Sequence, residues 1–290
     1  MAEPPPRLRV GIIGAGRVGA VLGAAWRRAG HHITGVSAVS DVSRLRAEAL
    51  LPGVPIRSVP EICSDAEAIL VAVPDDVLAD LVRGLASTGV LRPGVFLIHA
   101  SGRHGLGVFE PAQGCVPLAI HPVMTFTGTS LDLERLSGVP CGVTAPDDFR
   151  SVAEALALEL GGEPIWVPES ARVRYHAALS YASNFMNTLV SQASELLEQE
   201  GMSDPARILA PLLHASLDNA LRLRDRGLTG PIARGDAESI ARHLEVLDEP
   251  VVAASYRAMG RLAADRALSA GLITVDQAAA LLTVLAAKDE

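Results

Sequence analysis

The feature that most constrains this chain is a glycine-rich turn between an apolar run and an amphipathic helical pattern. Residues 11–26 read GIIGAGRVGAVLGAAW and contain the spacing Gly14-x-Gly16-x-x-Gly19. In a strand, turn and helix unit, the first glycine permits a tight turn, the second lets the backbone approach a pyrophosphate, and the third lets helix and strand pack closely. The helix N-terminus adds free N–H groups and the positive end of its dipole. The turn therefore predicts a dinucleotide site; a glycine turn that binds nothing is the alternative.

The order of apolar runs and helical patterns predicts the fold class. Runs typical of buried strands fall at residues 9–13, 33–39, 68–73, 95–99, 115–121, 139–145 and 163–169, and helical periodicity falls at 17–30 and 75–85. This alternation is typical of an α/β doubly wound, mainly parallel sheet with helices on both faces. After about residue 170 only helical patterns remain, over 170–201 and then from Asp204-Pro205, Asp236, Pro250 and a TVDQ capping box at Thr274. We therefore expect a dinucleotide-binding Rossmann domain over 7–168 and an all-α substrate and dimerisation domain over 169–290.

Composition excludes several kinds of partner and site. A net charge of -8 opposes broad contact with nucleic acid. The three cysteines are widely spaced and the histidines lack ligand spacing, so we expect neither disulfides nor a metal. The N-terminal residues lack a signal-peptide layout and the longest apolar run near the C-terminus has 10 residues, which favours a cytoplasmic protein without a membrane partner. Lys288 is the single lysine beside 24 arginines, which nearly excludes a buried catalytic lysine.

The tip of the second predicted strand indicates which dinucleotide is bound. An enzyme that prefers NAD usually carries a carboxylate there, for the ribose 2′-OH. Residues 37–40 offer none, and Arg44 and Arg46 follow within the next turn, where they could accommodate a 2′-phosphate. Asp41 is the opposing observation, although it could simply cap the next helix. We therefore expect NADP, with NAD less favoured.

The predicted cofactor contacts come from several strand ends, because ligands of open parallel sheets lie at the carboxyl ends of the strands. They are Gly14, Ala15, Gly16, Arg17, Val18 and Gly19 in the turn, Ser37, Ser40 and Arg44 at the second strand, and Val73, Pro74, Ser101 and Gly102 after two later strands. Ser101 would lie near the nicotinamide; an ordinary capping role is its alternative.

A polar stripe runs along the long helical segment. Residues 175–194 contain no Asp, Glu, Lys or Arg, so we expect this helix to be buried between a domain and a partner. His176, Ser180, Ser183 and Asn187 fall on one helical line, with Asn184 beside them. Because buried polar groups must be paired, the stripe either faces the cleft and the nicotinamide or forms hydrogen bonds in a dimer core.

Two further stretches carry candidate residues. His121 follows a predicted strand directly, where an imidazole can exchange a proton near neutral pH, or it is a structural loop histidine. In LTGPIARGD, residues 228–236, Arg234 could hold a carboxylate or a phosphate in a turn that also contains Thr229, or it forms a surface ion pair. We expect Asp236 to cap the following helix.

With these residues in view, the chain resembles the Rossmann-like oxidoreductases that carry a C-terminal helical domain of unknown function. These are relatives of pyrroline carboxylate reductase and of the 6-phosphogluconate dehydrogenase superfamily, and some members are alternative ketopantoate reductases. The matching stretches are GIIGAGRVG, AVPDD, HASG, HPVMTF, YHAALSYASN and LTGPIARGD. The resemblance implies an NAD(P)-dependent homodimer built through the helical domain, with the active site between domains.

The resemblance also implies roles for individual residues. HPVM looks like the His-Pro-Met segment of prephenate dehydrogenases, in which the histidine acts on a substrate hydroxyl, and this points to His121. The long helix lacks the lysine that wider-superfamily hydroxyacid dehydrogenases use there, so the acid would be His176, His121 or an ordered water, with Asn184 orienting the substrate.

These observations predict a reductase that transfers hydride from NADPH to a small carboxylate substrate. Arg234, Thr229 and Ser180 are the expected substrate contacts. On resemblance alone, a 2-keto acid such as ketopantoate ranks first and a cyclic imino acid second. The alternative is a dinucleotide-binding regulatory or scaffold homodimer without catalysis.

Overall fold

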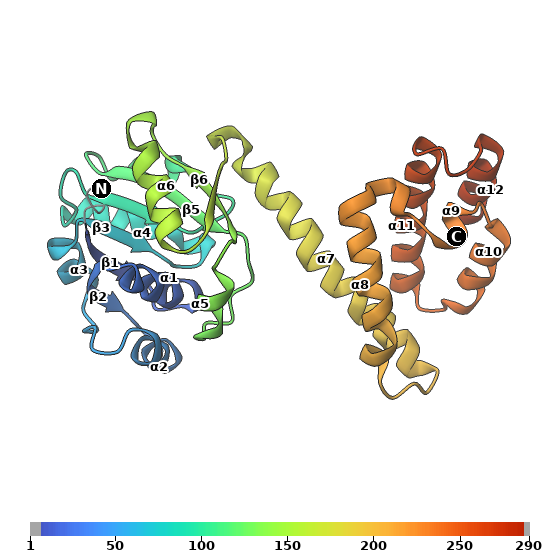
Figure 1. The fold of residues 1–290 in the computed structure, drawn as a ribbon, viewed down its shortest axis with the longest axis horizontal. Coiled ribbons are helices and arrows are strands. Elements are labelled where there is room, and N and C mark those ends of the chain that lie inside the picture. Colours follow the sequence, from blue (N-terminus) through green and yellow to red (C-terminus); the bar gives the residue numbers. More distant parts are fainter. Residues whose placement is uncertain (1–6, 287–290) are drawn as a thin grey trace, which may run out of the picture. The chain divides into compact units, whose positions relative to one another are not determined.

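The computed structural model describes residues 7–286, which fold into two compact units that divide between Ser183 and Asn184 (Figure 1). This division falls inside the long helix α7 (Arg172–Gln199), beyond the boundary at 168 that the end of the strand pattern suggests. Strands do end close to that point, at Trp166. The first turns of α7 therefore belong to the unit that contains the sheet.

The first unit is built on one seven-stranded sheet with the order β2-β1-β3-β4-β5-β6-β7. The strands are β1 (Arg9–Ile13), β2 (His32–Ser37), β3 (Ala68–Val71), β4 (Phe96–His99), β5 (Val116–Pro122), β6 (Pro140–Thr144) and β7 (Glu163–Trp166). Neighbours are parallel except β5 and β6, where His121 pairs with Gly142. A parallel return needs a crossover that traverses the sheet, and the helix between β5 and β6 has only five residues. The prediction of a doubly wound, mainly parallel sheet is confirmed.

Helices cover both faces of the sheet (Figure 1). They are α1 (Arg17–Arg28), α2 (Asp41–Leu50), α3 (Val59–Asp65), α4 (Asp75–Thr88), α5 (Leu131–Arg135) and α6 (Arg150–Glu159), with short 3-10 turns η1 (Leu106–Phe109), η2 (Asp147–Phe149) and η3 (Glu169–Ala171). Along β3, Leu70 belongs to the core beneath α1 and α6, whereas Ile69 and Val71 belong to the core beneath α3 and α4. Successive side chains of a strand point to opposite faces, which is why a strand buried on both faces reads as a continuous apolar run.

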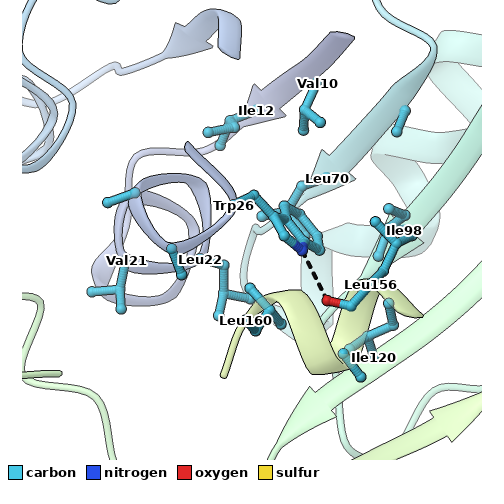
Figure 2. Packing of buried hydrophobic residues seen from close by; sticks show 14 of the residues in the cluster. Val10, Ile12, Val21, Leu22, Trp26, Leu70, Ile98, Ile120, Leu156 and Leu160 are labelled. Carbon is cyan, nitrogen blue, oxygen red and sulfur yellow. Dashed lines mark hydrogen bonds between the residues drawn. The ribbon is translucent and has the colours of Figure 1, made fainter. Parts of the chain in front are cut away.

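Trp26 anchors α1 against α6 in the larger core (Figure 2). Its indole is fully buried, and Nε1 donates a hydrogen bond to the Leu156 carbonyl at 3.0 Å. Because α1 begins at the glycine turn, this contact also fixes the direction in which the turn presents its N–H groups.

The second unit is all-helical. After α7 come α8 (Pro205–Leu223), η4 (Arg224–Gly227), α9 (Gly230–Ala233), α10 (Ala237–Val246), α11 (Pro250–Ser269) and α12 (Val275–Leu285). Asp204 and Asp236 cap α8 and α10, and Thr274 and Gln277 form the predicted capping box of α12. A small core forms around Ile240, Ala264, Leu281 and Leu285.

Helix α7 is not buried by the rest of its own chain. Of its residues, Arg172 alone is buried, and Met186 and Leu189 are about half exposed. The burial predicted for the uncharged segment is against a partner molecule, and it therefore stays a prediction. Among the residues that the structure describes, no helix combines the length and apolarity needed to cross a membrane.

We expect Trp26→Phe to lower the free energy of unfolding by about 2 kcal/mol, because it removes the indole donor of the Leu156 carbonyl, which keeps only its bond from the Leu160 N–H, and leaves a void beside α6. Urea denaturation followed by far-UV circular dichroism measures the change. Trp166→Phe is the matched control. The Trp166 ring is half-buried, and Cζ of Arg150 lies 3.7 Å from the ring centroid. This substitution should lower the free energy of unfolding by less than about 1 kcal/mol. Equal losses for the two variants would contradict the assignment of Trp26 as the anchor.

Candidate functional site

Two of the three glycines in the turn are required by its backbone geometry. Gly14 has a φ of +103°, and a Cβ there would lie 2.5 Å from the Ala72 carbonyl oxygen. At Gly19 a Cβ would lie 2.0 Å from the Gly14 carbonyl oxygen. A Cβ at Gly16 would lie 3.9 Å from its nearest neighbour, the Ala72 carbonyl oxygen. This glycine therefore leaves the helix end open to approach and is not needed for packing.

Ser37 holds the turn from the end of β2. Its Oγ accepts a hydrogen bond from the Gly14 N–H at 2.9 Å, and its carbonyl accepts one from the Ala15 N–H, also at 2.9 Å. These two N–H groups are therefore engaged, and the predicted cofactor contact Ser37 acts here on the turn itself. At the start of α1 no side chain caps the helix and its first turn carries no acidic residue. The following N–H groups are left for an anion.

A cavity of about 330 Å³ opens beside this helix end. It is lined by predicted cofactor contacts, Gly16, Arg17, Val18, Val73, Pro74 and Ser101, together with Val71, Ala72, Asp75, Leu78 and Ala100. A second cavity of about 400 Å³ lies around η1 and contains none of the predicted residues. The glycine cradle and the first cavity fit the phosphates and one ring of a dinucleotide, with basic and hydroxyl groups at the rim.

Two arginines lie close to the turn. Arg46 on α2 donates a hydrogen bond to the Ala15 carbonyl at 3.4 Å. A Cβ at Gly128, in the loop after β5, would lie 2.5 Å from Nε of Arg46 and 3.0 Å from Cγ of Arg17. Arg44, the predicted phosphate ligand, lies two residues before Arg46 on α2 and is exposed, and these two residues fall on different faces of the helix. The structure thus brings Arg46, and not Arg44, into contact with the turn.

Ser40 is the N-cap of α2, and its Oγ accepts from the Ser43 N–H at 3.2 Å. Asp41 lies in the first turn of that helix, so the suggestion that Asp41 is the cap is wrong: the neighbouring hydroxyl takes this place.

The segment after β4 is fixed by a buried histidine. His99 Nδ1 accepts from the Ser101 N–H at 3.2 Å, so Nε2 carries the hydrogen that is donated to the Gly105 carbonyl at 3.0 Å. Burial lowers the pKa of His99 to about 3, so the ring is neutral. The Ser101 Oγ accepts from the His104 N–H at 3.2 Å, which is the capping role weighed above, and its hydroxyl hydrogen remains available to a ligand.

His121, His176 and Gly102 meet at the carboxyl edge of β4 and β5. The two imidazole centroids are 6.4 Å apart. A Cβ at Gly102 would lie 2.6 Å from the His176 ring and 3.0 Å from Nε2 of His121, so both rings approach the Gly102 backbone directly. Nδ1 of His121 is hydrogen-bonded to the Tyr175 hydroxyl at 2.9 Å. Gly102 directly follows Ser101, which lines the cavity; Gly102, His121 and His176 are not among its lining residues.

The environment of His121 keeps its imidazole neutral. Burial, followed by the Arg172 and His176 charges, lowers its pKa to about 4, and Asp75 opposes this only in part. At neutral pH His121 is therefore a hydrogen-bond donor or acceptor and not a charged acid.

Arg172, the first residue of α7, lies beneath this cluster and is 1% exposed. Its guanidinium donates to Thr144 Oγ1 at 2.8 Å and to the carbonyls of Ser101 at 3.3 Å, Ala119 at 3.2 Å and Gly142 at 3.0 Å. Burial lowers its pKa to about 10, which leaves it charged at neutral pH. One buried cation therefore binds the ends of β4, β5 and β6 to the start of α7.

Sequence reasoning missed both Arg172 and Tyr175. The only signal was their place at the start of a segment that is otherwise free of charge. Such a position does not reveal that the side chains turn back onto the sheet.

The remaining predicted site residues lie further along the helices. Ser180 follows His176 by one turn of α7, and Asn184 begins the second unit. Thr229 precedes α9 and Arg234 follows it. Arg234 is exposed and forms no ion pair with any described residue, while its carbonyl accepts from Gln277 Nε2 at 3.3 Å. Asp236 caps α10 through the Ser239 N–H at 3.0 Å, as predicted.

No three His, Cys, Asp or Glu side chains between residues 7 and 286 gather as the ligands of a metal ion would. Lys288 lies outside the described residues.

We expect Gly19→Ala to lower the free energy of unfolding by about 1–3 kcal/mol, because the added methyl meets a backbone carbonyl that cannot move aside. Gly84→Ala is the matched control. Gly84 lies exposed within α4 with open space around its Cα, so a methyl group should raise the free energy of unfolding by about 0.5–1 kcal/mol. Thermal and urea unfolding measure both changes, and a Gly19 variant as stable as the original chain would show that the close packing described here is wrong.

Comparison with known proteins supports this reading of the fold. A comparison with curated protein sequences finds no match. Among solved structures, a candidate NADP oxidoreductase from Bacteroides fragilis superposes with a TM-score of 0.76 at 22% identity, over 89% of this chain and 98% of that one. A protein from Thermotoga maritima gives 0.67 at 22% identity, over 90% and 99%. A pyrroline-5-carboxylate reductase from Coxiella burnetii gives 0.56 at 16% identity, over 95% and 99%.

At these identities the solved structures show a shared fold. Two family models match the sequence itself: residues 2–122 match a Rossmann-like domain, and residues 139–263 match a domain of unknown function, DUF2520. The sequence therefore matches a Rossmann-like model and then the DUF2520 model, the combination that the motifs predicted; the second match begins at β6 of the sheet and ends within α11.

Proposed function

We propose that this protein is an NADP-dependent reductase that transfers hydride to the C=O or C=N carbon of a small carboxylate substrate. The observation that carries the proposal is the position of a neutral imidazole, His121, against Gly102, the residue that follows Ser101 in the lining of the cavity beside the glycine turn. A dinucleotide cradle and a hydrogen-bond donor are thus combined at the carboxyl edge of the same strands.

The cofactor assignment rests on the turn and on the basic groups beside it. The free N–H groups at the start of α1 suit the pyrophosphate, and Arg17 supplies a cation next to them. The end of β2 carries no carboxylate, and Arg46 lies within reach of the same turn, which favours a 2′-phosphate over a free ribose hydroxyl. The fold is shared both with a candidate NADP oxidoreductase and with a protein solved with NAD bound, so the choice of NADP rests on the residues at the end of β2.

When bound, reduced NADP supplies a hydride, that is, two electrons and the hydrogen that joins the substrate carbon. His121 would donate a hydrogen bond from Nε2 to the substrate oxygen or nitrogen and stabilise the negative charge that develops there. The substrate heteroatom then takes one proton, from His176 or from water, so that the products are an alcohol or amine and oxidised cofactor. A neutral His121 polarises the double bond in this scheme and does not act as a charged acid.

Two substrate classes remain in view. A 2-keto acid such as ketopantoate is the first candidate, from the motif resemblance, and a cyclic imino acid is the second. The fold shared with pyrroline-5-carboxylate reductases supports keeping the imine. We propose Arg234 and Thr229 as ligands of the substrate carboxylate, with Ser180 and Asn184 as further polar contacts. Arg234 suits this role because it is exposed and has no ion-pair partner among the described residues.

We further propose that the protein forms a homodimer through its helical domain. Apolar side chains that a stable chain would normally cover lie exposed along α7 and α8, including Met186, Leu189, Leu212 and Leu217. A second copy would cover them, and the uncharged stretch of α7 would then become the dimer core. A dinucleotide-binding homodimer without catalysis is the alternative function, since no lysine stands on the long helix.

We expect His121→Gln to lower kcat for NADPH oxidation by about 100-fold or more while leaving the affinity for NADPH unchanged, because the imidazole acts on the substrate and does not hold the cofactor. The measurement is NADPH consumption with ketopantoate and with pyrroline-5-carboxylate, beside NADPH titration by fluorescence. His243→Gln is the matched control, because His243 makes the same kind of bond to a tyrosine in the second unit, 2.7 Å from Tyr256 Oη. If NADPH binds but neither substrate class is reduced, the non-catalytic alternative is favoured.

Arg46→Ala should weaken NADPH binding by at least tenfold and leave NADH binding nearly unchanged, because only NADPH carries the 2′-phosphate. Arg44→Ala is the comparison, and its effect should be smaller because Arg44 makes no contact with the turn. Titration of the four combinations of variant and cofactor measures this. Equal losses for NADPH and NADH would place Arg46 on another phosphate, and a larger effect at Arg44 would restore the assignment made from the sequence.

A further inference from the structure

Two residues at the start of α7 turn back onto His121 and have no part in the function proposed above. Tyr175 and Arg172 are three residues apart, so they share one face of the helix. The Tyr175 hydroxyl lies 2.9 Å from Nδ1 of His121, and the two rings meet edge to face with centroids 5.7 Å apart. Arg172 binds the Ala119 carbonyl, two residues before His121 on β5. The first turn of α7 therefore contacts both the His121 ring and the backbone of the strand just before it.

The chemistry of the pair decides where the imidazole hydrogen lies. A phenol has one hydrogen to donate, and burial raises the pKa of Tyr175, so the hydroxyl keeps it. Within the described residues, the Tyr175 hydroxyl has one hydrogen-bond partner, Nδ1 of His121. Donation from this hydroxyl to Nδ1 uses the phenol hydrogen, and a neutral imidazole in that arrangement carries its own hydrogen on Nε2; the reverse tautomer would leave the phenol hydrogen without an acceptor among the described residues.

Two glycines make this arrangement possible. A Cβ at Gly142 would lie 2.5 Å from the Tyr175 hydroxyl oxygen, so the strand opposite His121 must be bare for the tyrosine to reach Nδ1. A Cβ at Gly102 would lie 3.0 Å from both Cε1 and Nε2 of His121, so this edge of the ring lies against bare backbone. One side of the ring is occupied by the tyrosine, and no side chain of residue 102 covers the other.

The charges around His121 agree with this geometry. Arg172 and His176 on α7 disfavour a second proton on the ring, and Asp75 at the start of α4 favours it more weakly. Burial is the largest cause and also disfavours the charged ring, so the pKa of His121 is lowered to about 4 and the ring is neutral across the physiological range.

We propose that Tyr175 is a positioning residue that holds His121 in its Nε2–H form, with that hydrogen directed at the substrate heteroatom. Arg172 is the support beneath it, since it fixes the strand ends and the helical turn from which the two side chains approach each other. The use of the hydrogen by a substrate rests on the proposed function; the tautomer and its dependence on Tyr175 do not.

The experiment is ¹⁵N NMR of the full chain labelled at histidine, with His121→Gln identifying the His121 signals. We expect Nε2 protonated and Nδ1 unprotonated from pH 5.5 to 8 in the unaltered protein. In Tyr175→Phe the Nδ1 resonance should shift as its donor is lost, and a fraction of the Nδ1–H form should appear. Tyr256→Phe, which removes the same hydroxyl from the His243 pair, is the matched control and should leave both His121 signals in place.

A kinetic measurement joins the tautomer to the reaction. The assay uses whichever of ketopantoate and pyrroline-5-carboxylate is reduced. Tyr175→Phe should lower kcat by about 10- to 100-fold and leave the affinity for NADPH unchanged. This is the range of activity lost in metal sites when a histidine ligand loses its hydrogen-bond partner. Tyr256→Phe should keep the original kcat. A loss of NADPH affinity in place of kcat would overturn the positioning role.

The two proposals fail in different ways. If His121 carries its hydrogen on Nδ1, or if Tyr175→Phe leaves both nitrogen signals unchanged, the positioning proposal is overturned whatever the activity. If the signals change as expected but no substrate is reduced by the unaltered protein, the role of Tyr175 stands and the reductase function falls.

Discussion

The arrangement of the sheet-bearing unit depends on one buried cation. The Arg172 guanidinium is almost fully removed from water and has no carboxylate partner between residues 7 and 286; four oxygens from the ends of β4, β5 and β6 replace its hydration. A charge buried in this way is costly unless its hydrogens are used, so the three strand ends and the start of α7 must stay where these oxygens can meet it. Two of these oxygens, Thr144 Oγ1 and the Gly142 carbonyl, belong to β6. The antiparallel strand therefore supplies half of the groups that bind the buried cation.

The same cation connects the fold to the chemistry at its edge. His99 and His121 both lie near it, and both imidazoles are held neutral by burial and by its charge. Their neutral forms serve different ends. His99 uses both nitrogens to fix the segment that carries Ser101 and Gly102, whereas His121 uses Nδ1 for Tyr175 and has Nε2 beside the bare backbone of Gly102. A rigid, neutral donor beside a glycine cradle is the preorganised arrangement that hydride transfer to a polar double bond requires.

Much of the fold could be predicted from the sequence, because its signals are local. The apolar runs mark all seven strands to within a few residues, and Asp204, Asp236 and Thr274 mark helix starts through their own hydroxyl or carboxylate groups. The candidate site was predictable only in part. His121 and His176 stand at strand and helix positions that pattern can identify, but Arg44 was favoured over Arg46 because spacing alone cannot tell which side chain returns to the turn.

The sequence by itself determined the glycine cradle, the order of sheet and helical domain, and the set of residue types available for chemistry, since backbone strain, hydrophobic periodicity and composition act within short stretches. Only the tertiary structure decided that Arg172 and Tyr175 belong to the site, that Ser37 and Ser40 serve the backbone, and that His121 is neutral. These outcomes depend on oxygens, rings and bare glycines supplied by strands far apart in the chain, and a pKa or a hydrogen-bond direction exists only after burial has brought them together.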